Sequence, residues 1–158
     1  MNSPTTKKLL EQLHRKMIEE IQDYAIILLD LDGTILTWNK GVEKIKGYKA
    51  NEIIGKNFRI FYLARDREEG LPEKLLEHAK KEGRAKHIGR RVKKDGTTFW
   101  GSIVITALHD DENNIIGYSK VTKDLTERKA SEDRLSIFMQ ELKAYILDLI
   151  AVNNCASS

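Results

Sequence analysis

Two strand-like runs meet at Asp95-Gly96, and this dipeptide constrains the fold more than any other feature of the chain. A tight turn between two strands needs a backbone with positive φ, which glycine adopts without steric cost. The run after the turn, residues 99–108, has two alternating faces: Phe99, Gly101, Ile103, Ile105 and Ala107, and Trp100, Ser102, Val104, Thr106 and Leu108. Because neither face is strongly polar, this run is predicted to be a central strand of an antiparallel sheet.

The charge of the chain argues against a nucleic-acid partner. Its 158 residues include 27 Lys and Arg and 24 Asp and Glu, a net charge of +3, and such a mixed surface is not typical of nucleic-acid binding. The basic run at residues 90–94 follows a strand pattern and is interpreted as a solvated face. The single cysteine, Cys155, cannot form an internal disulfide, and no stretch has the features of a signal peptide or a membrane span. We therefore expect a cytoplasmic, soluble protein with no membrane partner.

The order of the predicted elements indicates an α+β fold. A helix over residues 4–23 precedes a second Asp-Gly hairpin, formed by residues 24–31 and 34–38 around Asp32-Gly33. Short helical turns follow, and then a helix over residues 71–81, with Pro72 near its start and Gly83 after its end. Strands are predicted over residues 84–94 and 115–123. The sequence thus predicts one five-stranded antiparallel sheet with short helices on one face.

Amphipathic helices are predicted at both ends. The helix within residues 1–23 has an apolar stripe at Leu10, Leu13 and Met17, which suits docking on its own domain and contact with a second copy equally well. At the other end, Asp124 is a suitable N-cap, and Glu127 is placed to complete a capping box. The helix over residues 130–152 carries a coiled-coil seam that predicts a homodimer, and residues 153–158 are expected to fray. The seam residues are Leu135, Phe138, Leu142, Tyr145 and Leu149.

Several short motifs follow one another in a specific order along residues 24–129. They are Asp32-Gly33-Thr34-Ile35 with Trp38-Asn39, Gly47-Tyr48 with Glu52-Ile53-Ile54-Gly55-Lys56, Lys94-Asp95-Gly96 with Phe99-Trp100, Gly117-Tyr118, and Asp124-Leu125-Thr126-Glu127-Arg128. In this order and spacing they resemble the PAS sensory domain. The resemblance implies a pocket for a small molecule or cofactor between the sheet and the helices that precede the third strand. It also implies that the terminal helix relays a signal, here through Asp124, Thr126 and Glu127, to an effector such as a histidine kinase of a two-component system.

The resemblance places the pocket among apolar residues that precede or lie within the sheet. The candidates are Ile26, Leu28, Ile45, Ile54, Phe58, Phe61, Leu75, Ile103, Ile105 and Tyr118. A ligand bound against the inner face of the sheet would shift the strands near Ile103, Ile105 and Tyr118 and thereby change the contact between terminal helices. The same residue types suit a plain core, so an empty module that serves only as a dimer platform stays open.

The residues at the family's cofactor positions argue against flavin and against haem. The segment Gly55-Lys56-Asn57-Phe58-Arg59 is similar to the light-sensing branch, but Phe58 stands at the reactive cysteine, Gly101 at a flavin-contacting asparagine and Tyr62 at a glutamine. Haem-sensing relatives use a histidine on the helix before the third strand, where this chain has His78. The neighbouring Glu77, Lys80 and Lys81 favour a solvated histidine, and no metal-ligand spacing links the four histidines.

A different function is indicated by Asp30-Leu31-Asp32-Gly33-Thr34 after an apolar run. This motif resembles the first motif of haloacid-dehalogenase-type phosphatases, in which Asp30 would be the nucleophile and Asp32 a general acid and base beside Mg²⁺. That fold needs a long crossover to a parallel strand, whereas the strand predicted after Thr34 follows at once. The sequence therefore favours a hairpin turn here and a sensory module without catalytic activity of its own.

Overall fold

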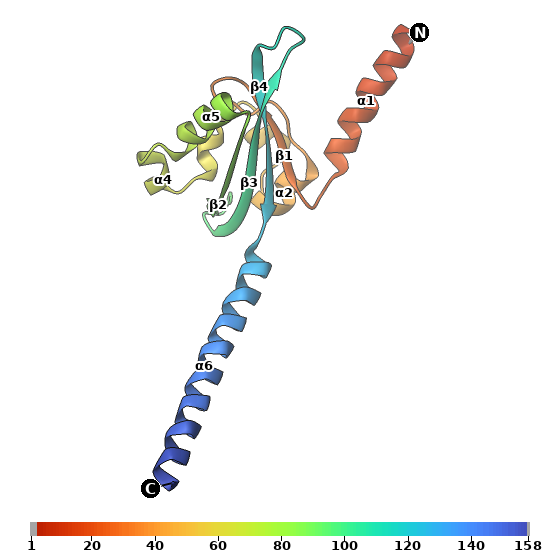
Figure 1. Ribbon diagram of the computed structural model, residues 1–158. Coiled ribbons are helices and arrows are strands. Elements are labelled where there is room, and N and C mark those ends of the chain that lie inside the picture. The colour runs from red at the N-terminus through yellow and green to blue at the C-terminus, as the bar shows by residue number, and fades with distance from the viewer. Residues whose placement is uncertain (1–2, 158) are drawn as a thin grey trace. The chain divides into compact units, whose positions relative to one another are not determined.

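The computed structural model describes residues 3–157. Along the chain, a helix and a strand are followed by a run of short helices, three strands and a long helix (Figure 1). The bounds are α1 Pro4–Glu20, β1 Ala25–Leu29, α2 Lys40–Lys46, α3 Ala50–Ile53, the 3₁₀ helix η1 Phe58–Phe61, α4 Ala64–Glu68, α5 Leu71–Glu82, β2 Arg84–Val92, β3 Thr98–His109, β4 Ile115–Asp124 and α6 Thr126–Ala156. The chain divides into two compact units, one ending at Asp124 and the other beginning at Leu125.

The four strands pair antiparallel in the order β1-β4-β3-β2, which confirms that β3 is central. The β2–β3 hairpin turns at Asp95-Gly96, where Gly96 has a φ of +84°. The Asp95 carboxylate accepts hydrogen bonds from the Thr97 N–H at 2.9 Å and from its hydroxyl at 2.6 Å. This corner sets a register in which Arg91 lies opposite Phe99, so the two residues share one face of the sheet.

The predicted α+β fold is confirmed, but the sheet of the described chain has four strands instead of five. Gly33 turns the chain at a φ of +87°, and the predicted fifth strand, residues 34–38, forms only the isolated bridges Leu29–Ile35 and Thr34–Asn57. The reason is that this segment divides its hydrogen bonds. The Leu36 N–H donates to the Leu28 carbonyl and the Ile35 N–H to the Lys56 carbonyl, each at 2.8 Å. Bonds shared between two neighbours do not build a continuous ladder.

The core lies between one face of the sheet and the helices α2, η1 and α5. Strand alternation directs Phe99, Ile103 and Ile105 of β3 into it. Helix α5 has a proline in its first turn and ends at Gly83, which has a φ of +85°, as the sequence predicts. Helices α4 and α5 lie beside the β2 side of the sheet (Figure 1). This arrangement puts a helical wall next to the inner face of β2.

Asn39 joins the N-terminal helix to the sheet and to α2. Its side chain is fully buried and makes five hydrogen bonds to the backbone. The two hydrogens of the amide nitrogen are shared among the carbonyls of Ile18, Ile21 and Tyr24, and the amide oxygen accepts from the N–H groups of Ile26 and Val42, all at 3.0–3.2 Å. Helix α1 ends at Glu20 instead of residue 23, and none of its own residues is buried. Residues 1 and 2 of the predicted segment lie outside the described residues.

Helix α6 differs from its prediction at both ends. Leu125 occupies the N-cap position and Asp124 is the last residue of β4, so the predicted Asp124 cap is wrong. The helix also continues through Ala156, where residues 153–158 were expected to fray; Ser158 lies outside the described residues. None of the described α6 residues is buried. Across residues 3–157, no helix combines the length and the apolar character that a membrane crossing requires.

Candidate functional site

Seven of the ten predicted pocket residues come together on the core side of the sheet. Each of them is at most 8% exposed. They are Ile45 of α2, Phe58 and Phe61 of η1, Leu75 of α5, Ile103 and Ile105 of β3, and Tyr118 of β4. The Phe58 ring packs edge-on against Tyr62, with 5.6 Å between ring centroids. The structure thus gathers most of the predicted set into one place, where its residues are packed as core.

The other three predicted pocket residues, Ile26, Leu28 and Ile54, lie away from the core. In β1 the buried positions are Ala25, Ile27 and Leu29, so Ile26 and Leu28 point to the opposite face of the sheet. There they line a groove of about 420 Å³ together with Ile54 and residues of α1. The prediction that Ile26 and Leu28 face the core is wrong, because a continuous apolar run does not show which alternate residues of a strand face inward.

Three cationic side chains, Lys46, Arg91 and Lys120, are buried in the core. The interpretation of residues 90–94 as a solvated face is therefore wrong at Arg91, which strand alternation turns inward, and burial of Lys46 and Lys120 was not predicted. Each is at most 1% exposed. Arg91 lies opposite Phe99, and Lys120 follows Tyr118 at a spacing of two, so the strand pattern directs both inward. Lys46 is the last residue of α2 and is followed by Gly47 in the left-handed region. We call these three residues the basic core cluster.

An aromatic ring lies close to each member of the cluster. The Lys46 ammonium lies 3.5 Å from the centroid of the Phe61 ring, and the Lys120 ammonium lies 5.2 Å from the same centroid. Lys120 also donates a hydrogen bond to the Thr122 hydroxyl at 3.0 Å. The Arg91 guanidinium lies 4.1 Å from the centroid of the Tyr62 ring. Such cation–π contacts offset part of the cost of removing a charge from water.

Hydrogen bonds satisfy the cluster only in part. The Arg91 guanidinium donates to the Arg90 carbonyl at 2.9 Å and contacts Nδ1 of His87 at 3.0 Å. Within the described chain, Nε of Arg91 and the hydroxyl of Tyr62 are buried without a hydrogen-bond partner. No carboxylate of the described residues forms an ion pair with any member of the cluster. An uncompensated buried charge is strongly destabilising, so the cluster needs a physical explanation.

Burial changes the protonation of the cluster. It lowers the pKa of Lys120 to about 7, helped by the positive charge of Arg91. Burial also lowers the pKa of Lys46 well below its ordinary value, and the neighbouring Lys120 and Arg91 act in the same direction. The pKa of the Tyr62 phenol is raised by burial to about 12, despite the nearby guanidinium. The two lysines therefore release their protons at lower pH than exposed lysines do.

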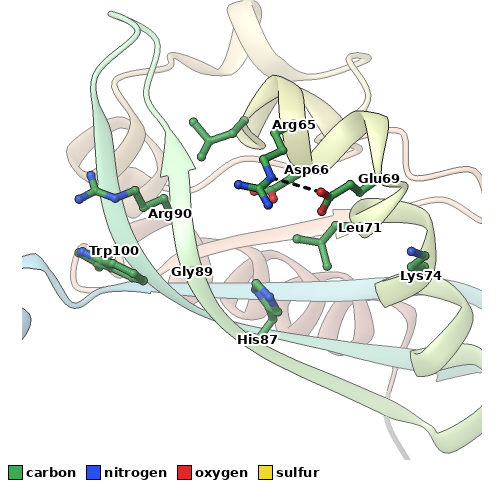
Figure 2. Close-up of a pocket in the computed structure, with 10 residues that line it drawn as sticks. Arg65, Asp66, Glu69, Leu71, Lys74, His87, Gly89, Arg90 and Trp100 are labelled. Carbon is green, nitrogen blue, oxygen red and sulfur yellow. Dashed lines mark hydrogen bonds and ion pairs between the residues drawn. The ribbon is translucent and has the colours of Figure 1, made fainter.

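A cleft of about 420 Å³ opens between helices α4 and α5 and the inner face of β2 (Figure 2). Its side walls carry Leu71 and charged side chains from α4 and α5, among them an Arg65–Glu69 ion pair at 3.2 Å. His87 and Gly89 of β2 lie on the side of the sheet. A Cβ atom at Gly89 would lie 3.2 Å from Nη1 of Arg91, so this glycine keeps the layer between the cleft and the guanidinium thin.

The structure does not supply the setting that the phosphatase motif requires. Asp30 and Asp32 lie at a turn, where the Asp30 carboxylate accepts hydrogen bonds from the N–H groups of Asp32 and Thr34, both at 2.9 Å. The strand before them, β1, pairs antiparallel with β4 at the edge of the sheet, whereas the enzyme needs a central parallel strand. The hairpin-turn interpretation of this motif therefore fits the backbone. His78 is exposed on α5, on the side predicted to be solvated.

The predicted dimer seam lies along α6. Leu135, Phe138, Leu142, Tyr145 and Leu149 are all more than 40% exposed within the described chain. The relay residues Thr126 and Glu127 form the first turn of this helix, and only Leu125 separates it from Asp124 at the end of β4. The connection between β4 and α6 is therefore a single residue.

Comparison with known proteins agrees with this architecture. A family model described as PAS domain matches residues 23–127. Two-component system protein A of Emericella nidulans is 39% identical over 142 residues, which are 90% of this chain and 21% of that protein. Sporulation kinase C of Bacillus subtilis is 25% identical over 130 residues, which are 82% of this chain and 29% of that protein. The chain thus spans well under half the length of these relatives.

A solved structure shows the same fold. The crystal structure of a PAS domain from Colwellia psychrerythraea superposes with a TM-score of 0.68 at 24% sequence identity, and the match covers 75% of this chain and 98% of that chain. The family match covers most of the sequence, and the antiparallel sheet with its helical wall is the fold that its motifs imply. By its sequence motifs, its sheet and the family model that it matches, this chain belongs to the PAS domain family.

Proposed function

We propose that this chain is the sensory and dimerisation module of a signalling protein of the two-component type, with no catalytic activity of its own. In this proposal a small molecule binds on the core side of the sheet, and helix α6 relays its presence to an effector such as a histidine kinase. A cytoplasmic location is part of the proposal, because the sequence has a single cysteine and no need for an oxidising compartment. The similarity to a two-component system protein and to a sporulation kinase supports this assignment.

One observation carries the proposal: within the described residues, α6 has an apolar seam whose side chains are all exposed. The seam residues step by three and four along the helix, as in a coiled coil. All of them are exposed, and none of the described α6 residues is buried. A helix of 31 residues with such a seam is stable when a second helix covers it. The proposed partner is α6 of another copy of the chain, which places the two output ends side by side.

The relay would use the short connection between β4 and α6. The side chains of Tyr118 and Lys120 face the core from β4, and Ile103 and Ile105 face it from the neighbouring β3. A ligand that displaces these side chains would shift β4, which ends at Asp124. Thr126 and Glu127 would transmit the shift to the seam and change how two α6 helices pack.

Sedimentation equilibrium of the full chain tests the proposal. The wild type is expected to be a dimer, and Leu142→Glu is expected to be a monomer because it places two like charges in the seam. Gln140→Glu is the matched control, since it adds the same charge at an exposed α6 position outside the seam. A Leu142→Glu variant that stays dimeric, or a wild type that is monomeric, would remove α6 as the dimer contact.

A further inference from the structure

The core of this chain holds positive charge without negative charge. The buried charged side chains of the described residues are Lys46, Arg91 and Lys120, and no aspartate or glutamate is among them. Burying a charged group without an opposite charge is costly, so proteins pair such groups or neutralise them. Lysine can be neutralised by losing a proton, but arginine cannot under ordinary conditions. Arg91 is therefore a permanent cation in this core.

The unsatisfied groups of the cluster are all able to donate hydrogen bonds. Nε of Arg91 and the hydroxyl of Tyr62 have no hydrogen-bond partner within residues 3–157. The two lysine ammoniums face the Phe61 ring, and Lys120 has a single hydroxyl acceptor. What would complete this set is an acceptor that carries negative charge. The nearest acid in the cleft, Asp66, acts on Arg91 through space but forms no ion pair with it.

The surroundings of the cluster limit the kind of anion. Phe58, Phe61 and Ile103 are buried core residues on the same side of the sheet as the cluster. Apolar walls suit a ligand with an apolar body, and they disfavour an inorganic phosphate, whose higher charge is more costly to desolvate. A carboxylate has one charge, and two oxygens that match the planar donors of an arginine. The core therefore favours an organic acid with an apolar body.

The cleft of Figure 2 lies beside the cluster, although Lys46, Arg91 and Lys120 do not themselves line it. His87 and Gly89 line this cleft, and both lie directly against the Arg91 guanidinium. The other charged side chains around the cleft are Arg65, Asp66, Glu69, Lys74 and Arg90, so cations outnumber acids at the opening. A rotation of the His87 side chain would expose the guanidinium to the cleft. The positive opening would also attract an anion.

We propose that the basic core cluster is the recognition site for a small organic carboxylate, which enters through the cleft between α4, α5 and β2. This inference rests on the proposed sensory function and names the chemical class of its ligand. The carboxylate would bind Arg91 and Tyr62 first and keep Lys120 and Lys46 protonated. Binding would then pair the mutually repelling cations with a negative charge. Because Arg91 lies on β2 and Lys120 on β4, contact of both with one ligand would draw these strands toward it and so displace β4.

Isothermal titration calorimetry of the full chain tests the proposal with four probes: acetate, butyrate, octanoate and benzoate. At least one is expected to bind, benzamide is expected to bind at least about tenfold more weakly than benzoate, and inorganic phosphate more weakly than the carboxylates, because the charge and the apolar body both contribute. Lys120→Met and Arg91→Gln are expected to weaken binding at least about tenfold. Lys123→Met is the matched control, since it removes an exposed lysine from the same strand.

A second measurement does not depend on variants. With ¹³C-labelled lysine, nuclear magnetic resonance should show two lysines that titrate well below the others, and the bound carboxylate should raise their pKa. Among the charged and titratable groups nearby, Arg91 of β2 acts on both lysines. His87 of β2, Tyr62 after η1 and Asp66 of α4 interact with Arg91, and Glu73 of α5 acts on Tyr62. Among these only the cluster lysines are expected to respond in this way.

Several outcomes would overturn the proposal. They are no binding by any of the four carboxylates, equal binding of benzamide and benzoate, tighter binding of phosphate, or unchanged binding in Lys120→Met that retains its near-ultraviolet circular dichroism. None of these outcomes touches the dimer test with Leu142→Glu. A failure of the carboxylate inference is therefore distinguishable from a failure of the sensory module itself.

Discussion

Lys120 should make the stability of the protein depend on pH. Its pKa is about 7 in the folded chain, against an ordinary value of 10.5. Between these two values the unfolded chain binds a proton that the folded chain has released. The free energy of unfolding therefore rises with pH over this range, and the stability contributed by the neutral lysine is lost as the pH falls toward 7. Each such lysine contributes at most about 1.4 kcal/mol per pH unit. Above about pH 10 the raised pKa of Tyr62 acts in the opposite direction, because unfolded tyrosine ionises first.

Urea unfolding at about pH 7.5, 8.5 and 9.5 measures this dependence, a range in which exposed lysines stay protonated and tyrosines stay neutral. The Lys120→Met variant should be more stable than the wild type near pH 7.5 and should show a smaller rise with pH, because methionine fills the same space without a charge. Lys46, whose pKa is lowered too, should account for the rise that remains. Lys123→Met should follow the wild-type curve, whereas a Lys120→Met curve parallel to it would show that Lys120 does not titrate in this range.

Replacing Asn39 should lower the free energy of unfolding by more than the small size of its side chain suggests. Its buried amide satisfies five backbone groups from α1, β1 and α2. After the Asn39→Ala substitution the Ile18 and Ile21 carbonyls and the Val42 N–H would keep backbone partners, whereas the Tyr24 carbonyl and the Ile26 N–H would lose the partner that Asn39 provides. We therefore expect the free energy of unfolding to fall by about 2–4 kcal/mol. Asn51→Ala, at an exposed position in α3, should change it by less than about 0.5 kcal/mol. Denaturant unfolding followed by tryptophan fluorescence measures both, and equal effects would mean that water replaces the amide.

The basic core cluster shows what a hydrophobicity pattern misses at the scale of single residues. A hydrophobicity pattern assigns charged residues to the solvent, so it predicts a solvated Arg91 within residues 90–94 and gives no reason to expect Lys46 or Lys120 in the core. A signal was present for two of them. The Asp95-Gly96 turn fixes the register that pairs Arg91 with the inward Phe99, and Lys120 stands between Tyr118 and Thr122 on the buried face of β4. Lys46, at the end of a short helix, had no comparable signal.

At the scale of elements, the β2–β3 hairpin needs Gly96 because of its left-handed backbone conformation, and not because a side chain would lack space there. Gly96 has a φ of +84°, and a Cβ atom there would meet nothing within 4 Å. The Gly96→Ala substitution should therefore lower the free energy of unfolding by about 1 kcal/mol through the left-handed backbone alone. Gly96→Asn should cost less, because asparagine tolerates this conformation. Thermal or urea unfolding of the two variants measures the difference, and equal losses would point to a side-chain clash instead.

The elements that could be predicted are those whose local signals and tertiary contacts agree. Helix α5 has its proline, its apolar side and its terminal Gly83, and the hairpin has its Asp-Gly corner; both form as predicted. The fifth strand failed because residues 34–38 divide their bonds between β1 and the loop before η1, which no local pattern shows. The predicted Asp124 cap of α6 is wrong because Asp124 is the last residue of β4, so the N-cap position falls on Leu125.

At the scale of the whole molecule, the order of motifs predicted the family while the details of the site stayed out of reach. Seven of the ten pocket candidates lie in the core because any PAS-like sheet needs apolar residues there. The phase of β1 and the buried cations depend on how strands and helices meet, which the sequence does not state directly. The sequence therefore predicted most of the apolar residues on the core side of the sheet, and the structure shows which charged groups lie beside them.

The two units of the chain should differ in what holds them together. The unit that ends at Asp124 has a buried core, whereas none of the described residues of α6 is buried. An isolated helix gains little stability from propensity alone, so α6 should be helical only while a second helix covers its seam. On dilution below the dimer dissociation constant, the far-ultraviolet helical signal should fall, while the near-ultraviolet signal of Trp38 and Trp100, both in the first unit, should stay constant.

Leu142→Glu should show the lower helical signal at every concentration and Gln140→Glu should match the wild type. A helical signal that is independent of concentration and of Leu142 would mean that α6 is stable without a partner, and the seam would then need another explanation.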